Sequence, residues 1–275
     1  MVFKIEGKVA LITGGASGLG LSHARELLRN GLKGVTLADI DVKNGEQAQK
    51  EISAEFGNNK VIFVETDVSH KDQFEDAFEK TVEYFGNLDI LINNAGIFND
   101  SIWEREVSIN LNGTIHGTFL GMEKYLKNYK QGEEAVIVNT SSIAGLRGNN
   151  AFPVYAGTKF AIMGTTSSWG NSYHYERTRV RVVSICPGVT ATSILETRNC
   201  AYSKDYVGAW TYSIDDAIED KNLCQTAEVV SKELVRILKY AKNGTVWVLE
   251  QSKPAYEFKM PLKESFLGNV LEDTD

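Results

Sequence analysis

Short apolar runs alternate with amphipathic stretches along the chain, and this alternation constrains the fold more than any other feature. Continuous apolar runs are typical of buried strands in a parallel sheet, and they occupy residues 8–13, 34–38, 61–64, 88–92, 135–139 and 180–185. Helical periodicity covers residues 21–28, 42–56, 74–85, 103–129 and 154–176, each predicted to be one helix. The sequence therefore predicts an α/β fold, a doubly wound parallel sheet of the Rossmann type, in a single domain over residues 1–275.

The turn after the first apolar run is rich in glycine and predicts a binding site for the phosphates of a dinucleotide. Glycines between a strand and a helix let the backbone approach a pyrophosphate, which then lies at the helix N-terminus. The alternative is a glycine-rich turn without a ligand, and the flanking strand and helix argue against it. The candidate contacts in this turn are Gly14, Ser17, Gly18, Leu19 and Gly20.

Asp39, at the end of the second apolar run, predicts which dinucleotide is bound. It follows the glycine turn by about 20 residues, where a carboxylate accepts hydrogen bonds from the adenosine ribose hydroxyls. This carboxylate would repel a 2′-phosphate, and residues 14–20 contain no arginine or lysine. Both features favour NAD over NADP. The alternative for Asp39 is a turn or a helix N-cap, a role for which Asp41 is the nearer competitor.

Tyr155 and Lys159 are four residues apart, so a helix places both side chains on one face, one turn apart. A nearby ammonium favours the phenolate form of a tyrosine. Lowering the tyrosine pKa from ~10 by ~3 units needs roughly 4 kcal/mol, which we expect Lys159 and the positive nicotinamide ring of an oxidised cofactor to supply. The pair then forms a base that takes the proton of an alcohol. An ordinary amphipathic helix has the same spacing, so the upstream motifs decide between the two interpretations.

Charge and composition argue against several other classes of function. The net charge of −7 disfavours nucleic acid and anionic membranes as partners. No apolar stretch approaches the ~18 residues of a membrane-spanning helix, and we identify no signal peptide, so we expect a cytoplasmic protein. Cys186, Cys200 and Cys224 are odd in number and scattered, and the four histidines match no metal spacing. We therefore expect neither a disulfide framework nor a metal site.

Several motifs keep a common order and spacing along the chain: residues 13–20, Asp67, residues 93–96, Asn110, Ser142, residues 155–159 and Pro187-Gly188. By these motifs the chain resembles the short-chain dehydrogenases/reductases over about residues 7–195. Within that family, residues 87–96 and 117–121 are similar to those of the hydroxyprostaglandin dehydrogenases, and residues 243–249 to those of the insect alcohol dehydrogenases. Residues 249–252 depart from the glycine-rich end of many members. The course of the chain after Leu249 therefore stays open.

The resemblance implies a role for each matching residue. Tyr155 would be the general base toward an alcohol or the acid toward a ketone, and Lys159 would lower its pKa and hold the nicotinamide ribose. Ser142, which the spacing favours over Ser141, would hydrogen-bond the substrate oxygen. Asn110 would help to hold a water relay behind Lys159. The remaining cofactor contacts would come from Asp67, Val68, Asn93, Ala95, Gly96, Tyr155, Lys159, Pro187, Val189, and Thr190 and Thr192, which compete for the carboxamide.

The resemblance also implies a reaction, in which an NAD-dependent enzyme oxidises a lipophilic primary or secondary alcohol to its carbonyl, or the reverse. Alternatives are a hydroxyprostaglandin-type or a steroid or terpenoid alcohol dehydrogenase. An alternative from another class is a non-catalytic NAD-binding protein for storage, sensing or scaffolding. The substrate and the direction of the reaction stay open.

Residues from about 193 to 223 would form a lid over the active site. An apolar pocket there would be lined by Ile194, Leu195, Tyr202, Tyr206, Trp210 and Tyr212, with Phe98, Ile143 and Phe152. An acidic run disfavours anionic substrates: Asp215, Asp216, Glu219 and Asp220. The helices that start near 103 and 154 would form a homodimer face, or part of a tetramer, through small residues at Ala156, Gly157, Ala161 and Gly164.

Overall fold

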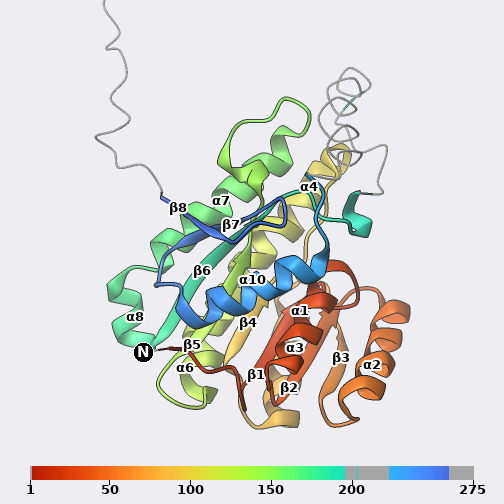
Figure 1. Cartoon of the computed structure of the whole chain (residues 1–275), viewed down its shortest axis with the longest axis vertical. Helices are drawn as coiled ribbons and strands as arrows, with labels where there is room; N and C mark the ends of the chain where they lie inside the picture. Colours follow the sequence, from red (N-terminus) through yellow and green to blue (C-terminus); the bar gives the residue numbers. More distant parts are fainter. Residues whose placement is uncertain (1, 196–202, 204–222, 260–275) are drawn as a thin grey trace, which may run out of the picture.

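A single sheet organises the part of the chain that the structure describes, residues 2–195, 203 and 223–259 of the computed structural model (Figure 1). The strands lie in the order β3-β2-β1-β4-β5-β6-β7-β8. All neighbouring pairs are parallel except β7 and β8, which are antiparallel. The strands are β1 (Val9–Thr13), β2 (Gly34–Asp39), β3 (Val61–Glu65), β4 (Ile90–Asn93), β5 (Ala135–Thr140), β6 (Val180–Pro187), β7 (Val246–Leu249) and β8 (Tyr256–Phe258). The predicted doubly wound parallel sheet is confirmed.

Helices cover both faces of this sheet because successive residues of each strand point to opposite sides. Ala10 and Ile12 pack with α1 (Gly18–Arg29), α2 (Val42–Phe56) and α10 (Ala227–Tyr240). Val9 and Leu11 pack on the other face with α3 (Lys71–Phe85) and with the long helical run that follows β4. Figure 1 shows α10 beside α1 across one face of the sheet. Burial of both faces explains why the strands read as continuous apolar runs.

The expected long helix over residues 103–129 is helical throughout, but its hydrogen-bond pattern changes four times. Three α-helical pieces, α4 (Trp103–Val107), α5 (Thr114–Phe119) and α6 (Leu126–Tyr129), alternate with the π-helical segments η2 (Ser108–Gly113) and η3 (Leu120–Tyr125). A short 3₁₀ turn, η1 (Asp100–Ile102), precedes them. Segments of π-helix occur often at functional sites, and η2 contains Asn110.

The helix predicted over residues 154–176 is wrong in one respect, because the structure divides it into α7 (Pro153–Trp169) and α8 (Ser172–Thr178). A side chain at Gly170 would overlap the backbone of Gly244, so the chain turns where these two segments cross. Asn243 holds the crossing by donating a hydrogen bond to the carbonyl of Gly170 over 2.8 Å. Asn171 then caps α8 by accepting from the backbone N–H of Tyr173.

The C-terminal part continues the sheet beyond the elements that the sequence predicts. After β7, Gln251 and Ser252 adopt left-handed φ angles of 56° and 55°, and the chain reverses into β8. Within the described ranges, two further 3₁₀ turns are η4 (Ile143–Leu146) and η5 (Ser193–Leu195). Most of the predicted lid, with its acidic run and the aromatic residues Tyr202, Tyr206, Trp210 and Tyr212, lies outside the described residues. No helix in the described ranges is long and apolar enough to cross a membrane.

The glycine turn predicts a stability effect at Gly20. A Cβ atom there would overlap the carbonyl of Gly14, because the first turn of α1 packs directly on the backbone that leaves β1. We expect Gly20→Ala to lower the free energy of unfolding by about 1–3 kcal/mol, the usual cost of overpacking. Urea denaturation measures this difference. Gly148→Ala, which meets open space, is the control, and an equally small effect in both variants would contradict the predicted overlap.

Candidate active site

A cavity of about 870 Å³ lies at the carboxyl ends of the parallel strands. Parallel α/β sheets bind ligands at this edge. Most residues that the sequence singles out line it: Gly14, Ser17, Gly18, Leu19, Asp39, Asp67, Val68, Ala95, Gly96, Ser142, Tyr155, Lys159, Pro187, Val189, Thr190 and Thr192. Gly20, Asn93 and Asn110 do not line it. One surface thus joins the glycine turn to the Tyr155 and Lys159 pair.

The glycine turn and Asp39 form one end of the cavity. Gly14 has a left-handed φ of 63° and lies so close to Ala95 that a Cβ would be 3.0 Å from its Cα atom. Asp39 accepts a hydrogen bond from the backbone N–H of Ala16 over 2.9 Å, which fixes the turn. Asp41, and not Asp39, caps α2 by accepting from the N–H of Asn44. Asp39 also accepts from the backbone N–H of Asp41 over 3.0 Å, so it is a turn residue as well as part of the cavity lining, and its contact with a ribose stays a prediction.

Thr13 joins the ends of β1 and β4, a role that the sequence patterns did not indicate. Its hydroxyl accepts hydrogen bonds from the backbone N–H groups of Asn94 and Ala95 over 2.9 and 3.0 Å. The Asn94 side chain donates back to the Thr13 carbonyl over 3.0 Å. These bonds hold Ala95 and Gly96 at the cavity wall.

Asp67 lines the cavity, but its carboxylate already accepts hydrogen bonds from other side chains and from the backbone. It accepts hydrogen bonds from Ser69 and from the guanidinium of Arg105, the latter over 2.6 Å. Burial alone would raise the pKa of Asp67, and the bonds from Ser69 and Arg105 outweigh it and hold the pKa at about 2. The charge of Asp67 is therefore largely neutralised by Arg105, which also lines the cavity.

Asn93 lies behind the cavity and not on its wall. Its side chain donates to Asn139 over 2.9 Å and to Thr118 over 3.3 Å. Asn139 in turn donates to Thr166 on α7 over 3.0 Å. This buried polar network connects β4 and β5 to the helices. The Asn93 side chain therefore stabilises the fold behind the cavity.

Asn110 clamps the loop that follows β4. Its side-chain carbonyl accepts from the N–H of Ile97 over 2.8 Å, and its amide donates to the carbonyl of Ile97 over 2.9 Å. A Cβ atom on Gly96 would lie 3.1 Å from Asn110 and 3.6 Å from Lys159 Nζ, so Asn110 is close to the lysine as the resemblance implies. The carbonyl oxygen and the NH₂ group of the Asn110 side chain thus both bind the backbone of Ile97. The predicted water relay stays a prediction.

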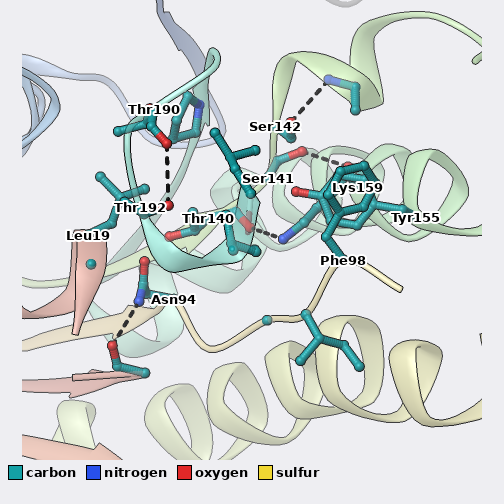
Figure 2. Close-up of a pocket in the computed structure, with 18 of the residues that line it drawn as sticks. Leu19, Asn94, Phe98, Thr140, Ser141, Ser142, Tyr155, Lys159, Thr190 and Thr192 are labelled. Carbon is teal, nitrogen blue, oxygen red and sulfur yellow. Dashed lines mark hydrogen bonds between the residues drawn. The ribbon is translucent and has the colours of Figure 1, made fainter. Parts of the chain in front are cut away.

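The two adjacent serines have different tasks. Ser141 donates its hydroxyl hydrogen to the carbonyl of Lys159 over 2.7 Å and is buried. The hydroxyl of Ser142 accepts from the N–H of Ala144 over 3.1 Å, which leaves its own hydrogen for another acceptor. Ser142 and Tyr155 both line the cavity, and the nearby Ser142 hydroxyl acts to lower the pKa of Tyr155. This division supports the choice of Ser142 over Ser141 (Figure 2).

Tyr155 stands among aromatic rings at the other end of the cavity. Its ring centroid is 4.4 Å from that of Phe98 and 6.0 Å from that of Phe152. Burial raises the pKa of Tyr155 above its ordinary value, and the nearby hydroxyl of Ser142 opposes the rise only in part. The lowering of this pKa expected in the NAD complex would have to overcome that effect of burial, and it stays a prediction.

Lys159 is 4% exposed, and its ammonium donates to the carbonyl of Thr140 over 3.0 Å at the end of β5 (Figure 2). Its Nζ atom lies 5.5 Å from the centre of the Tyr155 ring. Burial lowers the pKa of Lys159 to about 8. The lysine thus faces the tyrosine from one turn away, but it bonds to the sheet and not to the phenol oxygen.

Thr190 and Thr192 both line the cavity, with different partners. Thr190 donates to the carbonyl of Gly188 over 2.8 Å and is buried beside Gln225. Thr192 makes a longer bond of 3.3 Å to the carbonyl of Thr190 and lies next to Gly18. The hydroxyl of Thr192 is therefore the freer of the two.

The wall near Tyr155 is mainly apolar, and the predicted residues Phe98, Ile143, Phe152, Ile194 and Leu195 all belong to it. The sequence patterns did not single out Leu146, Arg147 and Asn149, which lie on the same wall. The described residues contain no group of three or more metal-ligating side chains. A pocket with this wall suits an apolar ligand with a few polar groups.

Comparison with known proteins identifies relatives that match most of the chain. The family profile described as short chain dehydrogenase matches residues 8–202. Human 15-hydroxyprostaglandin dehydrogenase [NAD(+)] is 35% identical over 249 residues, covering 90% of this chain and 93% of that protein. Alcohol dehydrogenase 1 of Ceratitis cosyra is 29% identical over 248 residues, with coverage of 90% and 93%.

A solved structure shares the fold as well. A short chain dehydrogenase/reductase from Burkholderia phymatum, in complex with NAD, superposes with a TM-score of 0.75. It is 26% identical in sequence, and the match covers 86% of this chain and 87% of that one. With the family profile and the sequence relatives, this shows that the chain belongs to the short-chain dehydrogenase/reductase family.

Proposed function

We propose that this oxidoreductase uses NAD to oxidise a lipophilic primary or secondary alcohol to its carbonyl, or to catalyse the reverse. The observation that carries the proposal is one cavity lined at one end by the glycine turn and Asp39 and at the other by Ser142, Tyr155 and Lys159. A general base, a hydroxyl donor and an ammonium beside an apolar wall are the groups that alcohol oxidation by hydride transfer needs.

The residues present fit a nicotinamide dinucleotide. Gly14 and Gly18 have left-handed φ angles of 63° and 52° and leave space that side chains would fill, at the start of α1. A dinucleotide pyrophosphate suits that helix N-terminus, and a ribose suits Asp39. The human relative is named as an NAD(+) enzyme, and the Burkholderia structure is described in complex with NAD. When bound, NAD accepts the hydride of the alcohol.

The chain's own groups handle the proton and the substrate oxygen. Tyr155 takes the hydroxyl proton of the alcohol, and Ser142 donates a hydrogen bond to the oxygen as charge develops on it. Lys159, held by Thr140, presents a positive charge toward the tyrosine and the nicotinamide ribose. For the carboxamide, the freer hydroxyl favours Thr192 over Thr190.

Two alternatives differ in substrate or in class. A hydroxyprostaglandin-type or steroid or terpenoid alcohol would also suit the apolar wall at Phe98 and Phe152. A non-catalytic NAD-binding protein would need no reactive groups, whereas Ser142, Tyr155 and Lys159 are all present in the cavity. Turnover of NAD with a panel of lipophilic alcohols tests the enzyme against the non-catalytic alternative. No turnover with any member, despite NAD binding, would favour the latter.

We also propose that two copies associate through α7 and the helical run of residues 103–129. Gly157 and Gly164 on α7 face open space, and Phe160 between them is 51% exposed. Small residues beside an exposed aromatic ring permit close helix packing with a second copy. Sedimentation distinguishes a dimer or tetramer from a monomer. The single-domain organisation with a lid over about 193–223 and the cytoplasmic location stay predictions.

The first functional prediction concerns the base. Tyr155→Phe keeps the ring against Phe98 and removes only the hydroxyl, so we expect turnover to fall by ~10² or more. NAD affinity, measured by calorimetry, should change little. Tyr173→Phe is the matched control, since Tyr173 is 69% exposed and remote from the cavity lining. Turnover of Tyr155→Phe near that of the wild type would remove Tyr155 from the mechanism.

The second prediction concerns cofactor choice. The Asp39 carboxylate should make kcat/KM for NAD exceed that for NADP, because it repels a 2′-phosphate. We expect Asp39→Ser to shift the ratio toward NADP by about tenfold or more, which corresponds to ~1.4 kcal/mol. Asp41→Ser, which only alters the cap of α2, should leave the ratio unchanged. A preference of the wild type for NADP would contradict the assignment of Asp39.

The third prediction concerns pH. Burial raises the pKa of Tyr155 in the protein alone, so the positive nicotinamide ring and Lys159 must lower it in the NAD complex. With NAD saturating, kcat/KM for alcohol oxidation should rise with pH and level off above a midpoint well below the ~10 of free tyrosine. Ketone reduction should fall over the same interval because it needs the protonated phenol.

Lys159→Met tests the source of this effect. Losing the ammonium removes a charge that favours the phenolate, so the midpoint should move upward, and NAD affinity should weaken because the ribose contact is lost. An unchanged midpoint would show that the titrating group is not Tyr155.

A further inference from the structure

Helix α7, which carries Tyr155, begins on a carboxylate from another element. Asp100 of η1 is fully buried, and its two oxygens accept hydrogen bonds from the backbone N–H groups of Val154 and Tyr155 over 2.9 and 3.0 Å. A carboxylate anion at a helix N-terminus satisfies free N–H groups and interacts favourably with the helix dipole. The geometry therefore suits an ionised Asp100, with Tyr155 in the turn that it holds.

A second buried carboxyl group, that of Glu106 on α4, lies against Asp100. Glu106 is fully buried, and its Oε1 atom accepts from the N–H of Asn99 over 2.7 Å. Its Oε2 atom is buried and has no donor among the described residues, and the neighbouring carboxyl group of Asp100 raises the pKa of Glu106. A buried oxygen without a donor is costly as an anion, whereas a protonated Oε2 is itself a donor. Both Asp100 oxygens already accept N–H groups, so the proton belongs on Oε2 of Glu106.

The charges around Glu106 agree with this assignment. Burial raises the pKa of Glu106 most, the N–H of Asn99 and the charge of Lys159 on α7 lower it, and the adjacent Asp100 of η1 raises it further. Arg105 of α4 does not compensate a charge there, because its guanidinium is bonded to Asp67. An ionised Glu106 would further raise the pKa of Tyr155. The neutral form is therefore the one compatible with a tyrosine that must ionise.

We propose that Glu106 is a positioning residue, which as a neutral acid donates a hydrogen bond to Asp100 and so holds the capped first turn of α7, with Tyr155 in it, in place for the reaction. Neither Glu106 nor Asp100 is among the residues that line the cavity, so Glu106 acts through Asp100. The capping rests on the two hydrogen bonds that Asp100 accepts, and the protonation of Glu106 rests on its buried Oε2 atom, which has no donor among the described residues. The effect on turnover rests on the proposed function.

Two substitutions separate the hydrogen bond from the charge. Glu106→Gln keeps a donor for Asp100 and an acceptor for the Asn99 N–H, and cannot ionise, so we expect kcat/KM near neutral pH to stay within about twofold of wild type. Glu106→Leu keeps the bulk without the bond. We expect it to lower kcat by about tenfold or more, the scale of a lost hydrogen bond to a charged group, with NAD affinity unchanged. Glu104→Gln, the same change at an exposed site on α4, is the control.

The pH profile gives a second kinetic readout. A group whose folded pKa is raised contributes its bond at low pH and loses it as pH rises through that pKa. Above the plateau that ionisation of Tyr155 produces, alcohol oxidation by the wild type should therefore decline at more alkaline pH as Glu106 ionises, and Glu106→Gln should abolish only that decline. An identical alkaline decline in the wild type and Glu106→Gln, or full kcat in a folded Glu106→Leu, would overturn the proposal.

Infrared spectroscopy tests the protonation without substrate or cofactor. The wild type at neutral pH should show the carbonyl stretch of a protonated carboxylic acid, and this band should be missing from Glu106→Gln but present in Glu104→Gln. Its absence from the wild type would overturn the proposal even if Glu106→Leu fails to fold. If the band behaves as expected but the wild type turns over no substrate, the hydrogen bond from Glu106 to Asp100 stands and the proposed function is refuted.

Discussion

Burial of the Lys159 ammonium is the constraint on which the geometry of the site depends. A buried cation needs acceptors, and Lys159 finds one in the Thr140 carbonyl at the last residue of β5. Ser141 secures the same residue from its backbone side, and Gly145 lets η4 approach the Lys159 backbone where a side chain would clash. The strand end, the serine loop and α7 are thus tied together at one point. The relative placement of Ser142 and Tyr155 follows from that connection.

At the cofactor end of the cavity, hydrogen bonds between side chains and backbone groups connect the strand ends, in place of a buried cation. Thr13 binds the backbone after β4, Asn94 binds back to Thr13, and Asp39 binds the glycine turn. Each bond joins the carboxyl ends of neighbouring strands. A parallel sheet leaves backbone groups without ladder partners at this edge, and side chains of adjacent strands satisfy them. The ligand-facing surface is therefore preorganised by the sheet.

Local patterns predicted most of this architecture because the strands are buried on both faces and the site motifs lie at their ends. Features that depend on distant contacts escaped prediction. The break between α7 and α8 requires Gly244, and the short strand β8 is largely exposed and pairs only with β7. The side chain of Asn93 matches a family motif but lies in a buried network. Glu106 could have been noticed as an acid one turn before Asn110, although nothing local indicates its partner Asp100.

The electrostatics of Tyr155 show why a neutral Glu106 matters at such a site. Two unit charges 4 Å apart interact by about 4 kcal/mol at an effective dielectric of ~20, an energy comparable to the whole pKa adjustment that the tyrosine needs. Burial of Tyr155 already disfavours its ionisation, and both oxygens of Asp100 already accept hydrogen bonds at the N-terminus of α7. A second carboxylate beside them would offset the positive charge of Lys159. A protonated Glu106 can donate a hydrogen bond to Asp100, which caps α7. It also adds no negative charge beside the Tyr155 phenolate.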